Sequence, residues 1–119
     1  MDNDIKEIKH YIEIKDYNSL EEFLGVFMIP TKKLQNENFD ILCYSIECGC
    51  NEKIINQIFE WCNIREVDYY YFINNKLISP LLNSFIYKNF EIIEFLIKKG
   101  ANINRKYNNM TLLKYLITN

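Results

Sequence analysis

The sequence predicts an all-α fold made of paired helices, and three observations lead to this prediction. Apolar residues recur at the spacing of an amphipathic helix along most of the 119-residue chain. Short and longer polar connections alternate between these apolar stretches. Residues that start or stop helices stand at the ends of several stretches. Together these features predict one domain, residues 1–119, with about three helix pairs and a terminal helix.

Seven stretches show the apolar spacing of an amphipathic helix. They lie at 5–12, 20–27, 41–46, 54–59, 81–86, 92–97 and 112–116. In the first stretch, Ile5, Ile8 and Ile12 fall on one face of a helix. Ser19 is the predicted N-cap of the second stretch, and Pro30 follows its end.

The connections between these stretches predict how the helices pair. The short joints are 15–18, 48–51 and 87–90, and the longer polar loops run over about 28–39, 62–78 and 100–110. A helix pair followed by a loop, repeated along the chain, is the pattern of a helical-repeat protein. Glycine is scarce and asparagine is common, so we expect asparagine at turn positions that glycine often occupies.

The clearest repeat unit lies at 79–104. Ser79 and Pro80 suit the start of a helix, Gly100 suits the end of the next one, and Asn102 suits the turn that follows. The next equivalent start, Thr111, comes 32 residues after Ser79, close to the period of about 33 of ankyrin repeats. The chain therefore resembles the ankyrin-repeat family, most closely over 79–104.

This resemblance implies an ankyrin-type helical-repeat solenoid. Its units would cover about 4–37, 38–78, 79–110 and, as a partial repeat, 111–119. The chain departs from the family pattern, because Leu82, Cys43 and Lys114 stand where the motif has histidine, and Met110 and Cys62 stand near positions where it has glycine. The predicted loop 63–78 is also longer than the family's usual hairpin.

Composition argues against several classes of function. The net charge is −2 and the lysines are spread along the chain, unlike the basic patch of a nucleic-acid-binding protein. No apolar run approaches the roughly 20 residues that span a bilayer. The first residues also lack the basic and apolar regions of a secretory signal. We therefore expect a cytoplasmic protein that binds neither nucleic acid nor membrane and carries no cofactor.

The cysteines and the histidine form no recognisable catalytic or metal-binding motif. The cysteines are Cys43, Cys48, Cys50 and Cys62. One close pair without a second does not match the spacing of a zinc site, and nothing in the sequence brings His10 near a cysteine. Phosphate-loop and hydrolase motifs are absent from the sequence. We expect structural thiols and no enzyme, with a cysteine-based metal, redox or enzyme site as the least favoured alternative.

The resemblance implies a partner-binding surface on the hairpin loops and on the concave ends of the first helices. The candidate contact residues are Tyr69, Tyr70, Tyr71, Asn75, Lys76, Ile86, Tyr87, Glu47 and Lys106. Tyrosines are common at protein interfaces, and three of these candidates are consecutive. The competing interpretation is that these tyrosines pack on the hairpin base or on a neighbouring unit.

Two functions follow from these expectations. The first is a non-catalytic module that binds another protein, of unknown identity, through helix ends and hairpins. The alternative is a fragment or subunit of a longer array that stacks on another copy through its C-terminal helix. In that alternative, Leu112, Leu113, Leu116 and Ile117 would be partly exposed and would favour self-association.

Overall fold

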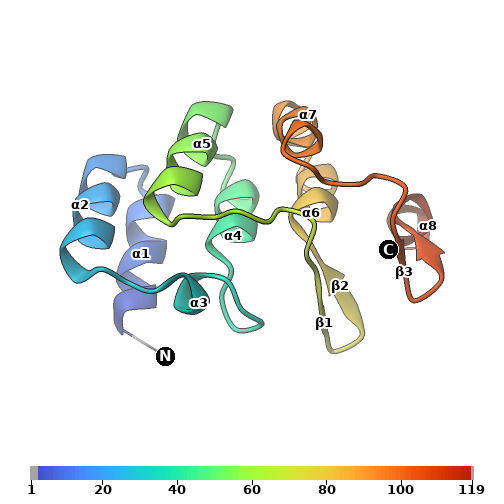
Figure 1. The fold of residues 1–119 in the computed structure, drawn as a ribbon, viewed down its shortest axis with the longest axis horizontal. Helices are drawn as coiled ribbons and strands as arrows, with labels where there is room; N and C mark the ends of the chain where they lie inside the picture. The colour runs from blue at the N-terminus through green and yellow to red at the C-terminus, as the bar shows by residue number, and fades with distance from the viewer. Residues whose placement is uncertain (1–2, 119) are drawn as a thin grey trace.

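The structure is a computed structural model that describes residues 3–118, and Figure 1 shows the order of its elements. The helices are α1 (Asn3–Glu13), α2 (Tyr17–Phe27), α3 (Thr31–Leu34), α4 (Ile41–Glu47), α5 (Glu52–Trp61), α6 (Pro80–Ile86), α7 (Phe90–Lys98) and α8 (Leu112–Thr118). The strands are β1 (Tyr71–Ile73), β2 (Lys76–Ile78), β3 (Lys106–Tyr107) and β4 (Met110–Thr111). Helices cover all seven stretches predicted from the apolar spacing.

The longer helices pack in consecutive pairs. α1 contacts α2, α4 contacts α5, and α6 contacts α7. Contacts between pairs run along two rows, α4–α6–α8 and α2–α5–α7. The molecule is elongated, 42 × 28 × 24 Å, with the α1–α2 pair at one end and α8 at the other (Figure 1).

The prediction of an all-α helical-repeat solenoid is wrong. Within residues 3–118 the fold is mixed, with 57% helix and 10% strand. β1 pairs with β2 and β3 pairs with β4, each as a two-stranded antiparallel sheet. β1, β2 and β3 lie in the segments 62–78 and 100–110, which the sequence predicted as loops, and β4 begins in the second segment and ends one residue after it, at Thr111.

Asparagines form the turns of both hairpins. Asn74 and Asn75 lie at φ 52° and 65°, and Asn108 and Asn109 lie at φ 50° and 65°. A two-residue hairpin turn needs positive φ at both positions, a conformation that asparagine adopts more easily than most residues. The expectation that asparagine takes glycine's place at turns is therefore confirmed here, although it was not used to predict strands.

The helix ends agree with most of the predicted caps. The Leu82 amide donates a hydrogen bond to the Ser79 hydroxyl at 3.0 Å, with Pro80 in the first turn of α6. Gly100 follows α7 at φ +114°, in the conformation that ends a helix without a Cβ clash. The cap predicted for α2 is wrong, because Asp16 is the N-cap and accepts a hydrogen bond from the Ser19 amide.

One short helix was not predicted. Helix α3 lies in the predicted loop 28–39 and has only one apolar buried residue, Leu34, so it gives no periodic signal. The Thr31 hydroxyl at its start donates a hydrogen bond to the Cys62 carbonyl at 2.9 Å. This bond links the segment after α2 to the end of α5.

Buried apolar side chains from α1 through α8 form one core cluster. Ile8, Ile46, Ile55 and Ile92 lie in different helices and are fully buried. Each buried isoleucine stabilises the fold by about 1.5–3 kcal/mol relative to an exposed one. None of the helices in residues 3–118 has both the length and the apolar character needed to cross a bilayer.

Candidate functional site

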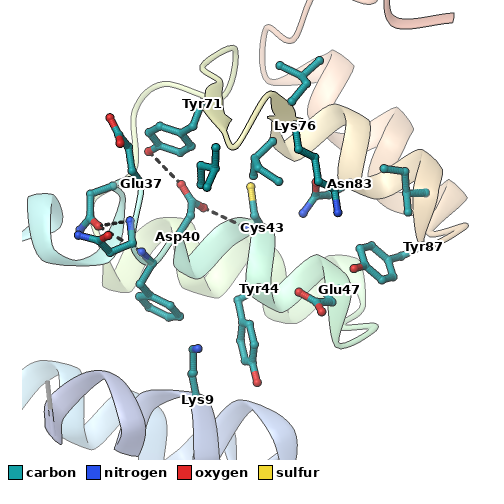
Figure 2. A pocket seen from close by; sticks show the side chains of 17 residues that line it. Lys9, Glu37, Asp40, Cys43, Tyr44, Glu47, Tyr71, Lys76, Asn83 and Tyr87 are labelled. Atoms are coloured by element: carbon teal, nitrogen blue, oxygen red, sulfur yellow. Dashed lines mark hydrogen bonds between the residues drawn. The ribbon is translucent and has the colours of Figure 1, made fainter. Parts of the chain in front are cut away.

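A groove of about 320 Å³ opens between α4, the β1–β2 hairpin and the end of α6. Its lining residues are Lys9, Asn36, Glu37, Asn38, Phe39, Asp40, Cys43, Tyr44, Glu47, Tyr71, Ile73, Lys76, Leu77, Ile78, Asn83, Ile86 and Tyr87. We call it the α4 groove, because one side of α4 provides its floor (Figure 2).

Asp40 fixes the hairpin to the start of α4. Its carboxylate accepts hydrogen bonds from the Cys43 amide at 2.9 Å, the Tyr69 hydroxyl at 2.9 Å and the Tyr71 hydroxyl at 3.2 Å. Gln35 in turn donates to the Tyr69 hydroxyl at 2.9 Å. One carboxylate therefore caps the helix and orients the side of the groove that carries Tyr71 (Figure 2).

Burial affects the protonation of Asp40, Tyr69 and Tyr71, which together form what we call the Asp40 joint. Desolvation raises the pKa of Asp40 above its usual range, while the three hydrogen bonds act in the opposite direction. Desolvation, followed by the charge of Asp40, raises the pKa of both Tyr69 and Tyr71. The two hydroxyls therefore stay protonated at neutral pH and remain donors to the carboxylate.

At the α1 side of the groove, a lysine lies over two aromatic rings. The ammonium of Lys9 is 5.6 Å from the centre of the Phe39 ring and 5.1 Å from that of Tyr44. The two rings are themselves 5.9 Å apart. The Tyr44 hydroxyl donates a hydrogen bond to Glu13. These contacts tie α1 to α4 and leave a positive charge at this edge of the groove.

The opposite side of the groove is more exposed. Ile86 is 44% exposed and Tyr87 is 46% exposed. Figure 2 shows the side chains of Glu47, from α4, and Tyr87, at the end of α6, facing each other. Burial and then the negative charge of Glu47 raise the pKa of Tyr87. An exposed aromatic ring beside a carboxylate offers both apolar contact and hydrogen bonding to a partner.

The structure brings together some of the predicted contact residues and separates others. Five of them line the α4 groove: Glu47, Tyr71, Lys76, Ile86 and Tyr87. Asn75 lies exposed in the β1–β2 turn, and Lys106 lies exposed on β3. Neither lines the groove, and whether any of these residues binds a partner stays a prediction.

The consecutive tyrosines pack against the rest of the protein. Tyr69 and Tyr71 hold Asp40, and Tyr70 lies edge-to-face with Tyr107 at 4.9 Å between ring centres. All three are partly buried. For this cluster the structure favours packing over a freely exposed interface, although Tyr71 also lines the groove.

Sequence reasoning missed part of the groove. Lys9, Asp40 and Tyr44 were not among the predicted contacts, yet all three line it. A usable signal was present for two of them, because positions 40, 44 and 47 are three or four residues apart. Residues at this spacing share one face of a helix. Lys9 comes from α1, and nothing in its local sequence indicates the contact with α4.

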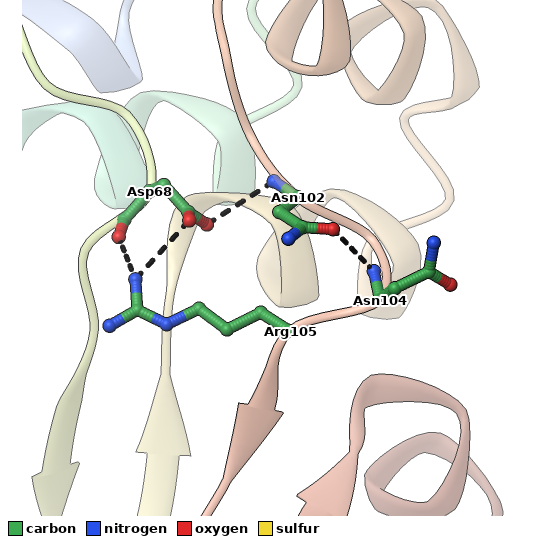
Figure 3. Close-up of polar contacts among 4 residues, drawn as sticks. All are labelled: Asp68, Asn102, Asn104 and Arg105. Carbon is green, nitrogen blue, oxygen red and sulfur yellow. Dashed lines mark hydrogen bonds and ion pairs between the residues drawn. The ribbon is translucent and has the colours of Figure 1, made fainter.

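A second aspartate joins the two hairpin segments. Asp68 accepts a hydrogen bond from the Asn102 amide at 3.3 Å and forms an ion pair with Arg105 at 3.3 Å (Figure 3). Arg105 also donates to the Asp68 carbonyl, and its guanidinium lies 4.8 Å from the centre of the Tyr70 ring. This joint orders the segment before β1 against the one before β3.

The thiols are poorly suited to nucleophilic or metal chemistry. Desolvation raises the pKa of all four cysteines, to about 12 for Cys62. The thiolate is the form that attacks substrates or binds metals, and burial disfavours it here. Within the part of the chain that the structure describes, no group of three or more His, Cys, Asp or Glu side chains is placed to hold a metal ion.

Comparisons with protein-family models, with curated proteins and with solved structures gave no match for this chain. The resemblance to ankyrin-repeat proteins therefore rests on the sequence pattern alone and stays a prediction.

Proposed function

We propose that the protein is a non-catalytic module that binds a segment of another protein in the α4 groove. The observation that carries this proposal is the convergence of five predicted contact residues on one groove, from α4, from both strands of the β1–β2 hairpin and from the end of α6. Cytoplasmic localisation belongs to the same proposal, and the four free cysteines are consistent with a reducing compartment.

The chemistry of the groove suits a polypeptide better than a small uniform ligand. Carboxylates come from Glu37, Asp40 and Glu47, and ammonium groups come from Lys9 and Lys76. Both signs of charge therefore surround a surface that also carries aromatic and aliphatic side chains. Protein interfaces combine such apolar anchors with a polar rim that sets orientation.

The test compares two double variants as baits in cell lysate. Glu47→Lys with Tyr87→Ala changes the exposed side of the groove. Glu94→Lys with Phe90→Ala makes the same types of change on α7, where Phe90 is 67% exposed and the Glu94 side chain is 76% exposed. Neither α7 residue lines the groove, so this double variant is a matched control.

A partner captured by the wild type and by the α7 variant, but lost from the groove variant, would support the proposal. Loss of an aromatic anchor together with a charge reversal should weaken such binding by on the order of a hundredfold. Equal capture by all three proteins would contradict it. Tyr70 and Tyr71 are unsuitable for this test, because their packing and hydrogen bonds make a folding defect hard to separate from lost binding.

A further inference from the structure

We infer that copies of this chain associate head to tail, with α8 of one copy on the α1–α2 groove of the next. This inference does not depend on the α4 groove, because neither surface contains a residue that lines it. It rests on exposed apolar side chains at both ends of the molecule and on opposite charges beside them.

The first surface is the outer side of α8. Leu113 is 67% exposed and Ile117 is 75% exposed, and one helical turn separates them. Lys114, which is also exposed, lies beside them and carries the only charge of α8. The expected exposure of this helix is confirmed for Leu113 and Ile117, whereas Leu112 is buried at 2% exposed.

The second surface is a groove of about 300 Å³ between α1 and α2. Its lining residues are Glu7, Tyr11, Ser19, Glu22, Phe23, Val26 and Phe27. Val26 is 67% exposed and Phe27 is 60% exposed. The charged residues of this lining are Glu7 from α1 and Glu22 from α2, so this apolar groove has an acidic rim.

The two surfaces complement each other in charge and in apolar character. Exposed apolar patches with polar rims are typical of protein interaction sites, and opposite charges favour the pairing of one surface with the other over the pairing of either with itself. Because α8 and the α1–α2 pair lie at opposite ends of the long axis (Figure 1), the two surfaces of one chain cannot contact each other. Such a heterologous contact either closes a ring or continues as an open chain.

Three single variants at equally exposed sites test this inference by analytical ultracentrifugation. Val26→Glu blocks the α1–α2 groove, Leu113→Glu blocks α8, and Phe90→Glu on α7 is the control. Each of the three wild-type side chains is 67% exposed, so all three variants should melt like the wild type. Ile117→Glu is the second α8 variant if Leu113→Glu melts early.

The wild type and the control should form species larger than a dimer as concentration approaches about 1 mM, the range of a weak contact. Each blocked variant alone should associate on the order of tenfold more weakly. An equimolar mixture of the two blocked variants should form a complex of two chains and stop there, since only one intact pair of surfaces remains. A monomeric wild type, a wild type that stops at a dimer, or a mixture that does not associate would overturn the inference.

Discussion

Asp40 and Asp68 each accept hydrogen bonds from residues about 30 or more positions later, yet their surroundings differ. Asp40 is buried and is held by two neutral tyrosine hydroxyls and a backbone amide. The Asp68 side chain is 22% exposed, and its main partner is the cationic Arg105. Both aspartates join one loop segment to the next.

The difference follows from the cost of burying charge. A buried arginine beside Asp40 would lose its hydration as well, and the attraction between the two charges often fails to offset that loss. Neutral hydroxyls satisfy the carboxylate at a smaller cost. Near the surface, Arg105 keeps part of its hydration while it stacks on Tyr70. We therefore expect the Asp40 joint to dominate stability and the Asp68 joint to respond to salt.

The largest expected effect is that of Asp40→Ala. It removes the N-cap of α4 and leaves the Tyr69 and Tyr71 hydroxyls without their acceptor. We expect the free energy of unfolding in urea to fall by about 3 kcal/mol. Asp40→Asn keeps an accepting oxygen and should lose clearly less. Losses well below 1 kcal/mol for both variants would show that the hydrogen bonds to Asp40 contribute little.

Next in size is the effect of removing one hydroxyl. Tyr69 is more deeply buried than Tyr71, and its hydroxyl both accepts from Gln35 and donates to Asp40. Tyr69→Phe should therefore reduce the free energy of unfolding by about 1–3 kcal/mol, and Tyr71→Phe by less. The same urea titrations give both values. A larger loss for Tyr71→Phe would reverse the proposed order of the two bonds.

The third effect concerns the Asp68 joint, which lies near the surface. Arg105→Gln removes the ion pair with Asp68 and the stacking on Tyr70, which should cost about 1 kcal/mol. In about 1 M salt the difference from wild type should shrink, because ions screen the pair. Arg105→Lys keeps the charge but not the planar stacking group, so it separates the two contributions. A loss for Arg105→Gln that does not change with salt would assign the effect to the Tyr70 ring contact and the hydrogen bond to the Asp68 carbonyl, and not to the ion pair.

These two joints also show why the sequence predicted the helices better than their connections. Helix periodicity is local, so Ile8 and Ile12 reveal their burial within a few residues. The bond from Tyr69 to Asp40 spans 29 positions, and no local pattern indicates it. Likewise, the hairpin strands are only two or three residues long, too short for an alternating pattern to stand out.

The α4 groove was partly predictable for the same reason. Glu47, Ile86 and Tyr87 lie at helix ends, where the repeat pattern places them without tertiary information. Lys9 reaches the groove only because α1 packs beside α4, as its contact with the Tyr44 ring shows. Contacts between units depend on packing, which a single sequence does not specify residue by residue.

The smallest expected effect is the pH dependence of the Asp40 joint, because its hydrogen bonds oppose the effect of desolvation. The pKa of Asp40 is raised in the folded protein, so the folded state holds this proton up to a higher pH than the unfolded state. The cost of burying the charge is therefore fully present above the folded pKa and disappears as pH falls toward the ordinary value of 3.8.

Since Asp40→Asn carries no such proton, the wild type should gain stability relative to that variant between neutral pH and about pH 4. Urea titrations of both proteins across this range measure the difference. A relative gain for Asp40→Asn on acidification would mean that the hydrogen bonds outweigh desolvation. The response to salt would then be the one remaining difference expected between the Asp40 joint and the Asp68 joint.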